Sequence, residues 1–440
     1  MGINTHSIEY RDPATIKLRK RPWRKYPARQ IAEAKRQLER TKMVVDPPLI
    51  DSDGYAVCGG AIIQATTELG WKSIPMLLVA NMSPEELRLY SINAHKLTEL
   101  GGYDDLLLIE ELRELDRLLE EDVFKCLAIE EGELTQLLGL GGKAVEDGTC
   151  SEVKQSVVAI TRPGDLWQFE NRCRMLCASS LEHGSFEMLM RGELAQFGLT
   201  DSPYNIPMST ISSDPTREEF AFAHGEMSPN EFTRFLTTVM RSMKGVSEPG
   251  AWHAYFMSYH FLLELLRAGT IVFGRPKAMC TWVKSQAGQG SPFRSQTEQI
   301  VYFRNGDAPP RDNVQLGKHG RNRSTAWHYD GMTTASGERA ELLKSHATPK
   351  AVNMLQDAIL DVTSHDGIVL DPFGGIGSTM LAAHAVERRA YLIEIEPRFV
   401  DVAVRRMQSA SGLVATRESD GRSFDDLEAE AAGKDQNENV

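Results

Sequence analysis

A glycine-rich segment near the C-terminal end limits what this chain can fold into. A short apolar stretch at 367–370 runs into a turn of sequence Asp-Pro-Phe-Gly-Gly-Ile-Gly-Ser-Thr at 371–379, and apolar residues with a helical pattern follow at 380–385. A second apolar stretch at 390–393 ends in Glu394. This order predicts a strand, a tight turn, a helix and a second strand that ends in an acid, which is typical of an α/β fold.

The turn and the acid suit a ligand that carries a sugar. Glycines let the backbone approach a ligand closely, and a carboxylate at the end of the next strand can bind a ribose diol. The dinucleotide pattern Gly-x-Gly-x-x-Gly does not fit, because counted from Gly375 it would need a glycine where Met380 stands. A glycine-rich turn taken alone is also compatible with a tight turn that binds nothing.

The composition describes a globular chain with more than one domain. Its 440 residues are 41% hydrophobic and 25% charged, and a chain of this length is expected to form more than one domain. No long apolar run is present, and the first residues lack the apolar core of a signal peptide, so we expect neither a membrane span nor secretion. The 6 cysteines lack Cys-x-x-Cys spacing, which favours a reducing cytoplasm and indicates no metal site.

The net charge of −12 is unevenly distributed. Basic residues crowd 17–42, whereas acidic residues concentrate in 104–133 and after Glu418. Because affinity for a polyanion depends on local patches, the acidic total does not exclude nucleic acid as a partner. Residues 17–42 are therefore a candidate arm for non-specific phosphate contacts, with a solvated basic helix as the alternative.

Hydrophobic periodicity and turn signals divide the chain into parts. The elements expected in the first part are a basic amphipathic helix at 28–42, two short strands around a turn at 49–57, a helix at 61–69, a strand at 74–79 and helices from Ser83 and over 104–121. A polar, glycine-rich stretch predicts a linker at 141–162. A second globular unit is expected at 163–410, and the acidic composition of 411–440 predicts a disordered tail.

Several motifs in the second part resemble one enzyme family. The turn at 371–379, with Ile393-Glu394-Ile395-Glu396-Pro397 after it, resembles the S-adenosylmethionine (SAM) site of DNA amino-methyltransferases. Thr200-Asp201-Ser202-Pro203-Tyr204 resembles their Asp-Pro-Pro-Tyr motif and precedes the SAM motif, as in the β group of these enzymes. Further similar segments are 282–284, 293–298, 321–327 and 346–350. The resemblance implies a Rossmann-like SAM-dependent methyltransferase domain over about 163–410, with a target-recognition insert at about 205–345.

The resemblance also implies a chemistry for residues 201–204. An exocyclic amine is a poor nucleophile because its lone pair is delocalised into the base, and two acceptors for its N–H groups favour the nucleophilic form. In the family these are the acid of the motif and the next backbone carbonyl, here Asp201 and Ser202. Pro203 completes the motif, and Tyr204 would stack on a base flipped out of the duplex.

The family pattern carries over to cofactor and DNA contacts. Asp371 would approach the methionine amino group of SAM, and Glu394 would bind the ribose hydroxyls. The other residues implied on the cofactor side are Phe373, Gly375, Gly377, Ser378, Thr348 and Lys350, the last two near the carboxylate end. The residues implied in DNA contacts are Arg294, Arg321 and Arg323. Each of these side chains could instead be structural, and the reaction needs no metal.

Some positions depart from the family pattern. Ser202 replaces the first proline of the catalytic motif, which keeps the backbone carbonyl but loses the fixed φ of proline. Residues 177–180 stand where a Gly-Asp turn is usual, and Ala347 and Ala351 replace two prolines. These departures leave open a weakened or non-catalytic protein that binds DNA.

Residues 1–140 resemble the N-terminal domain of the ParB-like family. The strand-turn-strand, Gly59, the helix at 61–69 and Gly70-Trp71 carry this resemblance. Such domains in partition proteins can bind a nucleotide through Gly-x-x-Arg, but Ile62 holds the position of the arginine and cannot pair with a phosphate. The resemblance therefore implies a small α+β module for DNA docking or assembly, and a nucleotide-driven clamp is disfavoured.

The sequence thus predicts a ParB-like module joined to a SAM-dependent methyltransferase of double-stranded DNA. The acid at Asp201 favours adenine N6 as the target, with cytosine N4 and a DNA-binding pseudo-methylase as alternatives. A small-molecule methyltransferase is disfavoured, because the 205–345 insert is longer than a small substrate requires. The resemblance implies a bacterial or phage-encoded cytoplasmic protein of the restriction–modification kind, and it leaves a homodimer open.

Overall fold

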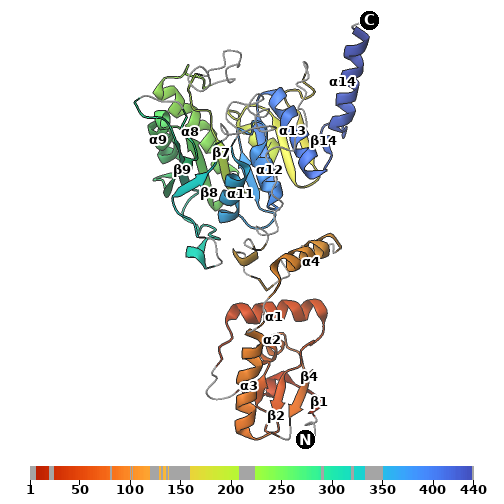
Figure 1. Ribbon diagram of the computed structural model, residues 1–440. Coiled ribbons are helices and arrows are strands. Elements are labelled where there is room, and N and C mark those ends of the chain that lie inside the picture. The colour runs from red at the N-terminus through yellow and green to blue at the C-terminus, as the bar shows by residue number, and fades with distance from the viewer. Residues whose placement is uncertain are drawn as a thin grey trace. The chain divides into compact units, whose positions relative to one another are not determined.

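The computed structural model describes residues 6–18, 24–79, 82–99, 101, 103–118, 128–129, 132–134, 137, 159–207, 223–288, 292–318, 322–331 and 350–438. The chain divides into two compact units, residues 1–130 and 131–440, and Figure 1 traces both of them. Within the described ranges, no helix is long and apolar enough to cross a membrane.

The N-terminal unit is a small α+β fold around a mixed sheet. Its strands are β1 (His6–Arg11), β2 (Leu49–Asp51), β3 (Ala56–Cys58) and β4 (Ile74–Val79), in the order β1-β4-β2-β3. Its helices are η1 (Pro13–Thr15), α1 (Ala28–Thr41), α2 (Gly60–Glu68), α3 (Pro84–Glu99) and α4 (Asp105–Leu118). The predicted elements between 28 and 79 are thus confirmed. Ile31 and Leu38 on one stripe of α1 are buried in the same core as Ile50, Ile74 and Met76 of the sheet.

The second unit is built on a ten-stranded sheet in the order β11-β9-β10-β8-β7-β12-β13-β6-β5-β14. Its strands are β5 (Leu166–Phe169), β6 (Cys173–Cys177), β7 (Ala195–Asp201), β8 (Ser247–Met257), β9 (Ala278–Lys284), β10 (Thr297–Arg304), β11 (Ala326–Tyr329), β12 (Ile368–Asp371), β13 (Arg389–Glu394) and β14 (Ala415–Arg417). The central strands β8, β7, β12, β13 and β6 are mutually parallel. The predicted α/β class is therefore confirmed for this unit.

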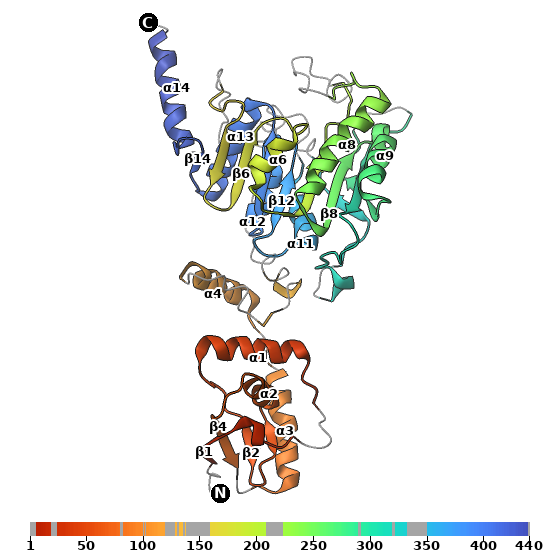
Figure 2. The same cartoon turned by 180° about the vertical axis from the view of Figure 1, so that it is seen from behind.

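Helices cover both faces of this sheet (Figures 1 and 2). The helices on the two faces are α6 (His183–Met190), α8 (Pro229–Gly245), α9 (Leu262–Phe273), α11 (Val352–Val362), α12 (Ser378–Ala385) and α13 (Pro397–Ser411). The unit also contains η3 (Tyr259–Phe261), η4 (Gln315–Gly317) and α14 (Phe424–Glu438), of which α14 extends away from the sheet. Val369 of β12 lies in the core that includes residues of α11, α12 and α13, whereas its neighbours Ile368 and Leu370 lie in the core of α6, α8 and α9. This alternation follows from the two-residue period of a strand that is buried on both faces.

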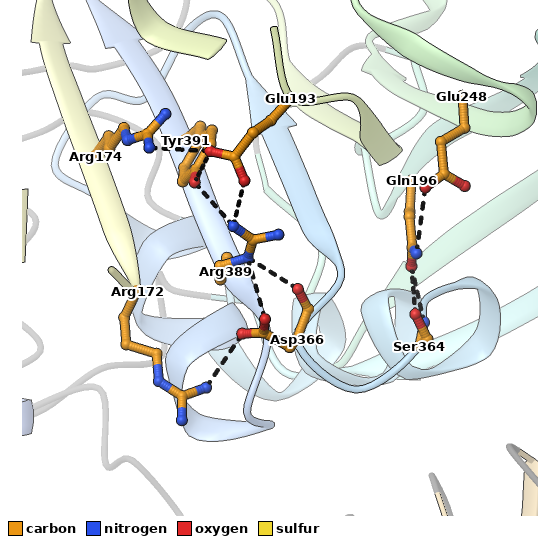
Figure 3. Close-up of polar contacts among 9 residues, drawn as sticks. All are labelled: Arg172, Arg174, Glu193, Gln196, Glu248, Ser364, Asp366, Arg389 and Tyr391. Carbon is orange, nitrogen blue, oxygen red and sulfur yellow. Dashed lines mark hydrogen bonds and ion pairs between the residues drawn. The ribbon is translucent and has the colours of Figure 1, made fainter. Parts of the chain in front are cut away.

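A polar network joins the amino ends of the parallel strands (Figure 3). Glu193, before β7, accepts a hydrogen bond from Tyr391 at 2.8 Å and forms ion pairs with Arg389 and, at 2.9 Å, with Arg174. Arg389 also donates to the Asp366 carbonyl oxygen at 2.9 Å. These contacts connect loops from distant parts of the chain at the amino edge of the sheet. The candidate site lies at the opposite edge, at the carboxyl ends of the strands.

The C-terminal segment corrects one prediction. Residues 411–440 were expected to be a disordered acidic tail, but β14 pairs antiparallel with β5, and α14 follows it. Phe424, at the start of α14, is fully buried, with its ring centroid 5.1 Å from that of Trp167. The segment orders because one aromatic side chain anchors it, despite its acidic composition.

The predicted linker at 141–162 falls largely outside the described residues. Its end is an exception, because the backbone N–H groups of Ile160 and Thr161 donate to the Asp401 carboxylate at 2.8 and 2.9 Å. These bonds join the end of the predicted linker to α13 of the second unit.

Candidate active site

The strand order places the site at one edge of the large sheet. From β12 the chain continues through α12 to β13 on one side, and from β7 it continues through α8 to β8 on the other side. In open α/β sheets, the carboxyl ends of two such diverging neighbours border a crevice where ligands bind. The residues at these ends are Asp201 on β7 and Asp371 on β12, with Glu394 on the adjacent β13.

Asp371 is buried, and the turn after it holds its carboxylate. One oxygen accepts the Phe373 backbone N–H at 3.1 Å, and the other accepts the Thr379 hydroxyl at 2.6 Å. Burial raises the pKa of Asp371 to about 6, although these donors act against the rise. The carboxylate is therefore oriented but incompletely compensated, which suits a group that meets a cationic ligand.

The glycines between 374 and 377 allow the turn to pack against its neighbours. A Cβ on Gly377, whose φ is +79°, would lie 2.9 Å from Cβ of Ala403 on α13. A Cβ on Gly374 would lie 2.9 Å from the Leu392 side chain on β13. Gly375 also has a positive φ, of 51°, and its N–H donates to Glu394 at 2.9 Å. Only glycine satisfies this combination of close packing and left-handed backbone.

Glu394 links the turn to β13. One of its oxygens accepts the N–H of Gly375, and the other accepts the N–H of Glu396 at 2.8 Å. Burial raises the pKa of Glu394 to about 7, and the nearby Asp371 carboxyl adds to the rise. Each carboxylate oxygen has capacity for a second hydrogen bond, so the group can still accept from a diol.

Phe373 and Ser378 complete the predicted cofactor side. The Phe373 ring is partly buried and stacks on Phe235 of α8, with centroids 5.8 Å apart. Ser378 is buried at the first position of α12. Both residues lie on the same turn as Asp371, as the motif predicts.

At the end of β7, both oxygens of Asp201 are engaged. Oδ1 accepts the Tyr204 hydroxyl at 2.8 Å, and Oδ2 pairs with the Lys350 ammonium at 2.8 Å. Burial raises the pKa of Asp201, the Lys350 ammonium opposes that rise, and the Glu298 carboxylate adds to it. Asp201 and Tyr204 are thus brought together, as the motif predicts.

Glu298 on β10 and Lys284 on β9 are site residues that the sequence did not single out. Glu298 pairs with Lys350 at 3.1 Å and with Lys284 at 2.5 Å, and it accepts the Tyr204 hydroxyl at 3.0 Å. Burial acts to raise the pKa of Glu298, but the two ammonium groups hold it down to about 2. Both residues lie in the family-like segments 282–284 and 293–298, and pairing of these strands as a hairpin was the signal that could have found them.

Lys350 was predicted near the carboxylate end of SAM. In the structure its ammonium pairs with Asp201 and Glu298, so this lysine contacts the predicted catalytic acid, and its approach to SAM stays a prediction. On the segment that carries Asp201, the hydroxyl of Ser202 is buried without a hydrogen-bond partner among the described residues. Such a group is suited to a donor or acceptor that a ligand supplies.

The predicted DNA contacts have different outcomes. Arg294 is exposed and donates only to loop carbonyls, among them that of Gly288 at 2.9 Å. Arg323 forms an ion pair with Asp361 at 2.9 Å and donates a hydrogen bond to Tyr329 at 2.7 Å, and its contact with DNA stays a prediction. Arg321 and Thr348 lie outside the described residues.

The fold and the site together define a doubly wound α/β protein with acids at the carboxyl edge of its sheet. Residues 195–405 match the N6_N4_Mtase family, described as DNA methylase. The matched segment contains Asp201, Asp371 and Glu394, and the family resemblance predicted from the motifs is therefore confirmed at this level.

Individual relatives cover only parts of the chain. The type II methyltransferase M.Cfr9I of Citrobacter freundii is 28% identical over 139 residues, which make up 31% of this chain and 43% of that protein. The chain thus spans less than half of the length of this relative. The crystal structure of the M1.HpyAVI–SAM complex matches 53% of this chain and 98% of its own, with 20% identity and a TM-score of 0.41.

A partitioning protein shows a more distant likeness to part of the chain. The C-terminally truncated partitioning protein ParB of Caulobacter crescentus, complexed with CTP-γ-S, matches 32% of this chain and 82% of its own, with 13% identity and a TM-score of 0.27. The ParB-like character of the N-terminal unit stays a prediction.

Proposed function

We propose that the second unit transfers a methyl group from SAM to the exocyclic amine of a flipped base in double-stranded DNA, with adenine N6 as the target. The observation that supports this most is the placement of Asp201, Asp371 and Glu394 at the carboxyl ends of three neighbouring strands, inside the segment that matches DNA methylases. Cytosine N4 is the alternative target, since the same acceptors serve either amine.

The residues of the crevice fit SAM. The left-handed glycines at 375 and 377 bring backbone close to a ligand at the strand ends. Asp371 provides a buried acceptor for an ammonium, and Glu394 provides one for a ribose diol. SAM would bring these donors, together with an electrophilic methyl group on its sulfonium.

In the proposed reaction, the residues of β7 and the loop after it orient the amine. The Asp201 carboxylate accepts one N–H of the target amine, and the Ser202 carbonyl accepts the other. Tyr204 holds Oδ1 of Asp201 in place through its hydroxyl. Lys350 Nζ lies 5.3 Å from the centroid of the Tyr204 ring, so the base would stack on the opposite face. Asp201, with a pKa raised by burial, then accepts the proton that the methylated amine releases.

A DNA-binding pseudo-methylase is the second candidate function. It is favoured by the ion pair between Lys350 and Asp201, which occupies an oxygen that the amine would need, and by Ser202 in place of a proline. The two candidates differ in whether the loss of Asp201 changes any measurable methylation.

For the N-terminal unit we propose a ParB-like module that docks on DNA or on another copy of the chain, in a bacterial or phage-encoded cytoplasmic enzyme. Basic residues on α1, such as Arg29 and Arg40, would add salt-dependent phosphate contacts. Ile62 is packed against the core of the unit, which speaks against a phosphate contact at this position.

The test uses the full chain, SAM with an isotopically labelled methyl group and unmethylated DNA of mixed sequence. The DNA is digested to nucleosides, and each methylated nucleoside is counted by mass spectrometry. Labelled N6-methyladenine is the expected result, and labelled N4-methylcytosine would change the target base. Unlabelled DNA with intact DNA binding would favour the pseudo-methylase.

A further inference from the structure

Asp201 belongs to a set of ionic side chains in direct contact with one another, and the Asp371 carboxyl lies near this set without an ion pair to it in the described residues. Asp201 and Glu298 are acidic, Lys284 and Lys350 are basic, and their contacts link all of them through distances of 2.5 to 3.1 Å. The formal charges sum to zero. Removing an ion from water costs free energy unless a counter-ion compensates it, so a largely buried set of this kind points to a function.

Lys350 is the centre of this set. Its side chain is only 5% exposed, and Nζ lies 2.8 Å from Asp201, 3.1 Å from Glu298 and 3.2 Å from the Tyr204 hydroxyl. The three ammonium hydrogens therefore have three acceptors. The rings of Tyr204, Phe256 and Trp282 surround the same nitrogen at 5.3, 5.4 and 5.8 Å from their centroids. This lysine is thus a fixed, buried cation that lies against the predicted catalytic acid.

A fixed cation at this point opposes the proposed reaction unless it is neutralised. The methyl donor is a sulfonium, and positive charge passes to the target amine as the methyl group moves. In the proposed reaction, the sulfonium and the amine that becomes positive both lie next to Asp201. An ammonium without a counter-ion would repel them there, and this repulsion is stronger away from bulk water. A lysine paired with Asp201 alone would also compete with the amine for that carboxylate.

Glu298 resolves both difficulties. It offers Lys350 a second carboxylate at nearly the same distance as Asp201, and it also anchors the Tyr204 hydroxyl. We propose that Glu298 is a positioning residue that neutralises and retains Lys350, so that Asp201 can accept the target amine beside a cationic methyl donor. The inference rests on the proposed methyl transfer, because only that reaction brings a sulfonium to this cluster.

The first test compares the binding of SAM and of S-adenosylhomocysteine, which lacks the methyl group and the positive charge. Glu298→Gln gives the cluster a net charge of +1, Lys350→Met gives −1, and the double variant returns it to zero. In Glu298→Gln, the ratio of the two dissociation constants should shift against SAM by about 10-fold, and the double variant should restore it. A packing defect would weaken both ligands equally and would overturn the inference.

The second test measures the rate of DNA methylation at saturating SAM. Glu298→Gln should lower kcat by about 10- to 100-fold, and the double variant should be faster than Glu298→Gln alone. Glu298→Asp, which keeps the charge, should retain more activity than Glu298→Gln. A double variant as slow as the single one would overturn the inference, while the proposed function would stand.

The matched control is Glu193→Gln, which breaks a comparable ion-paired cluster at the opposite edge of the sheet. It should leave the SAM preference and kcat unchanged. Thermal unfolding of each variant shows whether it is folded. A wild-type chain that labels no base would overturn the proposed function and this inference together, whereas loss of the charge effect in an active enzyme overturns the inference alone.

Discussion

The two edges of the large sheet carry similar ionic residues in different surroundings. At the amino edge, Glu193 and Arg389 have side chains that are 32% and 22% exposed, and the donors around Glu193 lower its pKa despite its partial burial. At the carboxyl edge, Asp371 is 3% exposed and its pKa is raised to about 6. The amino-edge acid is stabilised in its charged form, whereas the carboxyl-edge acid is not.

Within one sheet, the acids of the amino edge are suited to stabilising the fold, and those of the carboxyl edge are suited to binding a ligand. An exposed carboxylate with several donors contributes modestly to folding and has little left to offer a ligand. A buried carboxylate with a raised pKa costs folding free energy and gains most when a cation or hydroxyl arrives. The carboxyl edge is therefore where a bound ligand should stabilise the protein.

The largest effect is expected at Asp201. Asp201→Ala removes the acceptor for the target amine and the acceptor for its proton, so methyl transfer should fall by about 10²- to 10⁴-fold. The fold should persist, because Lys350 keeps its ion pair with Glu298. Labelled-methyl incorporation at saturating SAM measures the change, and a variant within a few-fold of wild type would assign the chemistry to another residue.

The pH dependence of SAM binding is the next test. Since the pKa of Asp371 is raised to about 6 and that of Glu394 to about 7, both groups hold protons in the free protein under conditions where the unfolded chain has lost them. Their contribution to the stability of the free protein therefore falls as the pH rises through this window, while their capacity to bind an ammonium or a diol grows. Affinity for SAM should rise by about 10-fold from pH 5 to pH 7.

Asp371→Asn should remove part of this slope, as measured by titration calorimetry at several pH values. Glu193→Gln should keep the slope unchanged, because its carboxylate lies at the other edge. An unchanged slope in Asp371→Asn would mean that Glu394 alone, or a group outside the strand ends, titrates with SAM binding.

A substitution at the amino edge should lower stability and leave activity unchanged. Glu193→Gln removes the negative charge that pairs with Arg174 and Arg389 and keeps one side-chain oxygen as an acceptor for Tyr391, so the free energy of unfolding should fall by about 1 kcal/mol. Chemical denaturation measures this change, and kcat should stay within about two-fold of wild type. A large loss of activity without a loss of stability would show that the two edges are coupled.

The site elements that are local in sequence were predicted correctly. The strand, turn, helix and acid from 368 to 394 follow from glycine positions and apolar runs within one short segment. Asp201 and Tyr204 share a single motif, and the structure joins them by a hydrogen bond at 2.8 Å. Such patterns can be recognised in the sequence because the residues that form the contacts lie close together along the chain.

Contacts across the chain could not be predicted in the same way. Lys350 meets Asp201 across 149 positions and Glu298 across 52, and no periodicity encodes such a pairing. Arg323 was carried over from the family pattern, and the sequence did not show its ion pair with Asp361 on a separate helix. The tail was expected to be disordered from its composition, although burial of Phe424 against Trp167 orders it. In each case one tertiary contact outweighs the local pattern.

The smallest effect, and the last test of the comparison, is expected at Ser202. The residue is 2% exposed, and its hydroxyl has no hydrogen-bond partner among the described residues, so the chain leaves a buried polar group unpaired next to the proposed catalytic acid Asp201. Ser202→Pro keeps the carbonyl that would accept the target amine, removes the unpaired hydroxyl and restricts the backbone. The methylation rate should rise by about two- to five-fold if Ser202 only loosens the motif. A fall in rate instead would mean that the Ser202 hydroxyl itself binds the ligand. The unpaired hydroxyl would then be a functional group of the carboxyl edge.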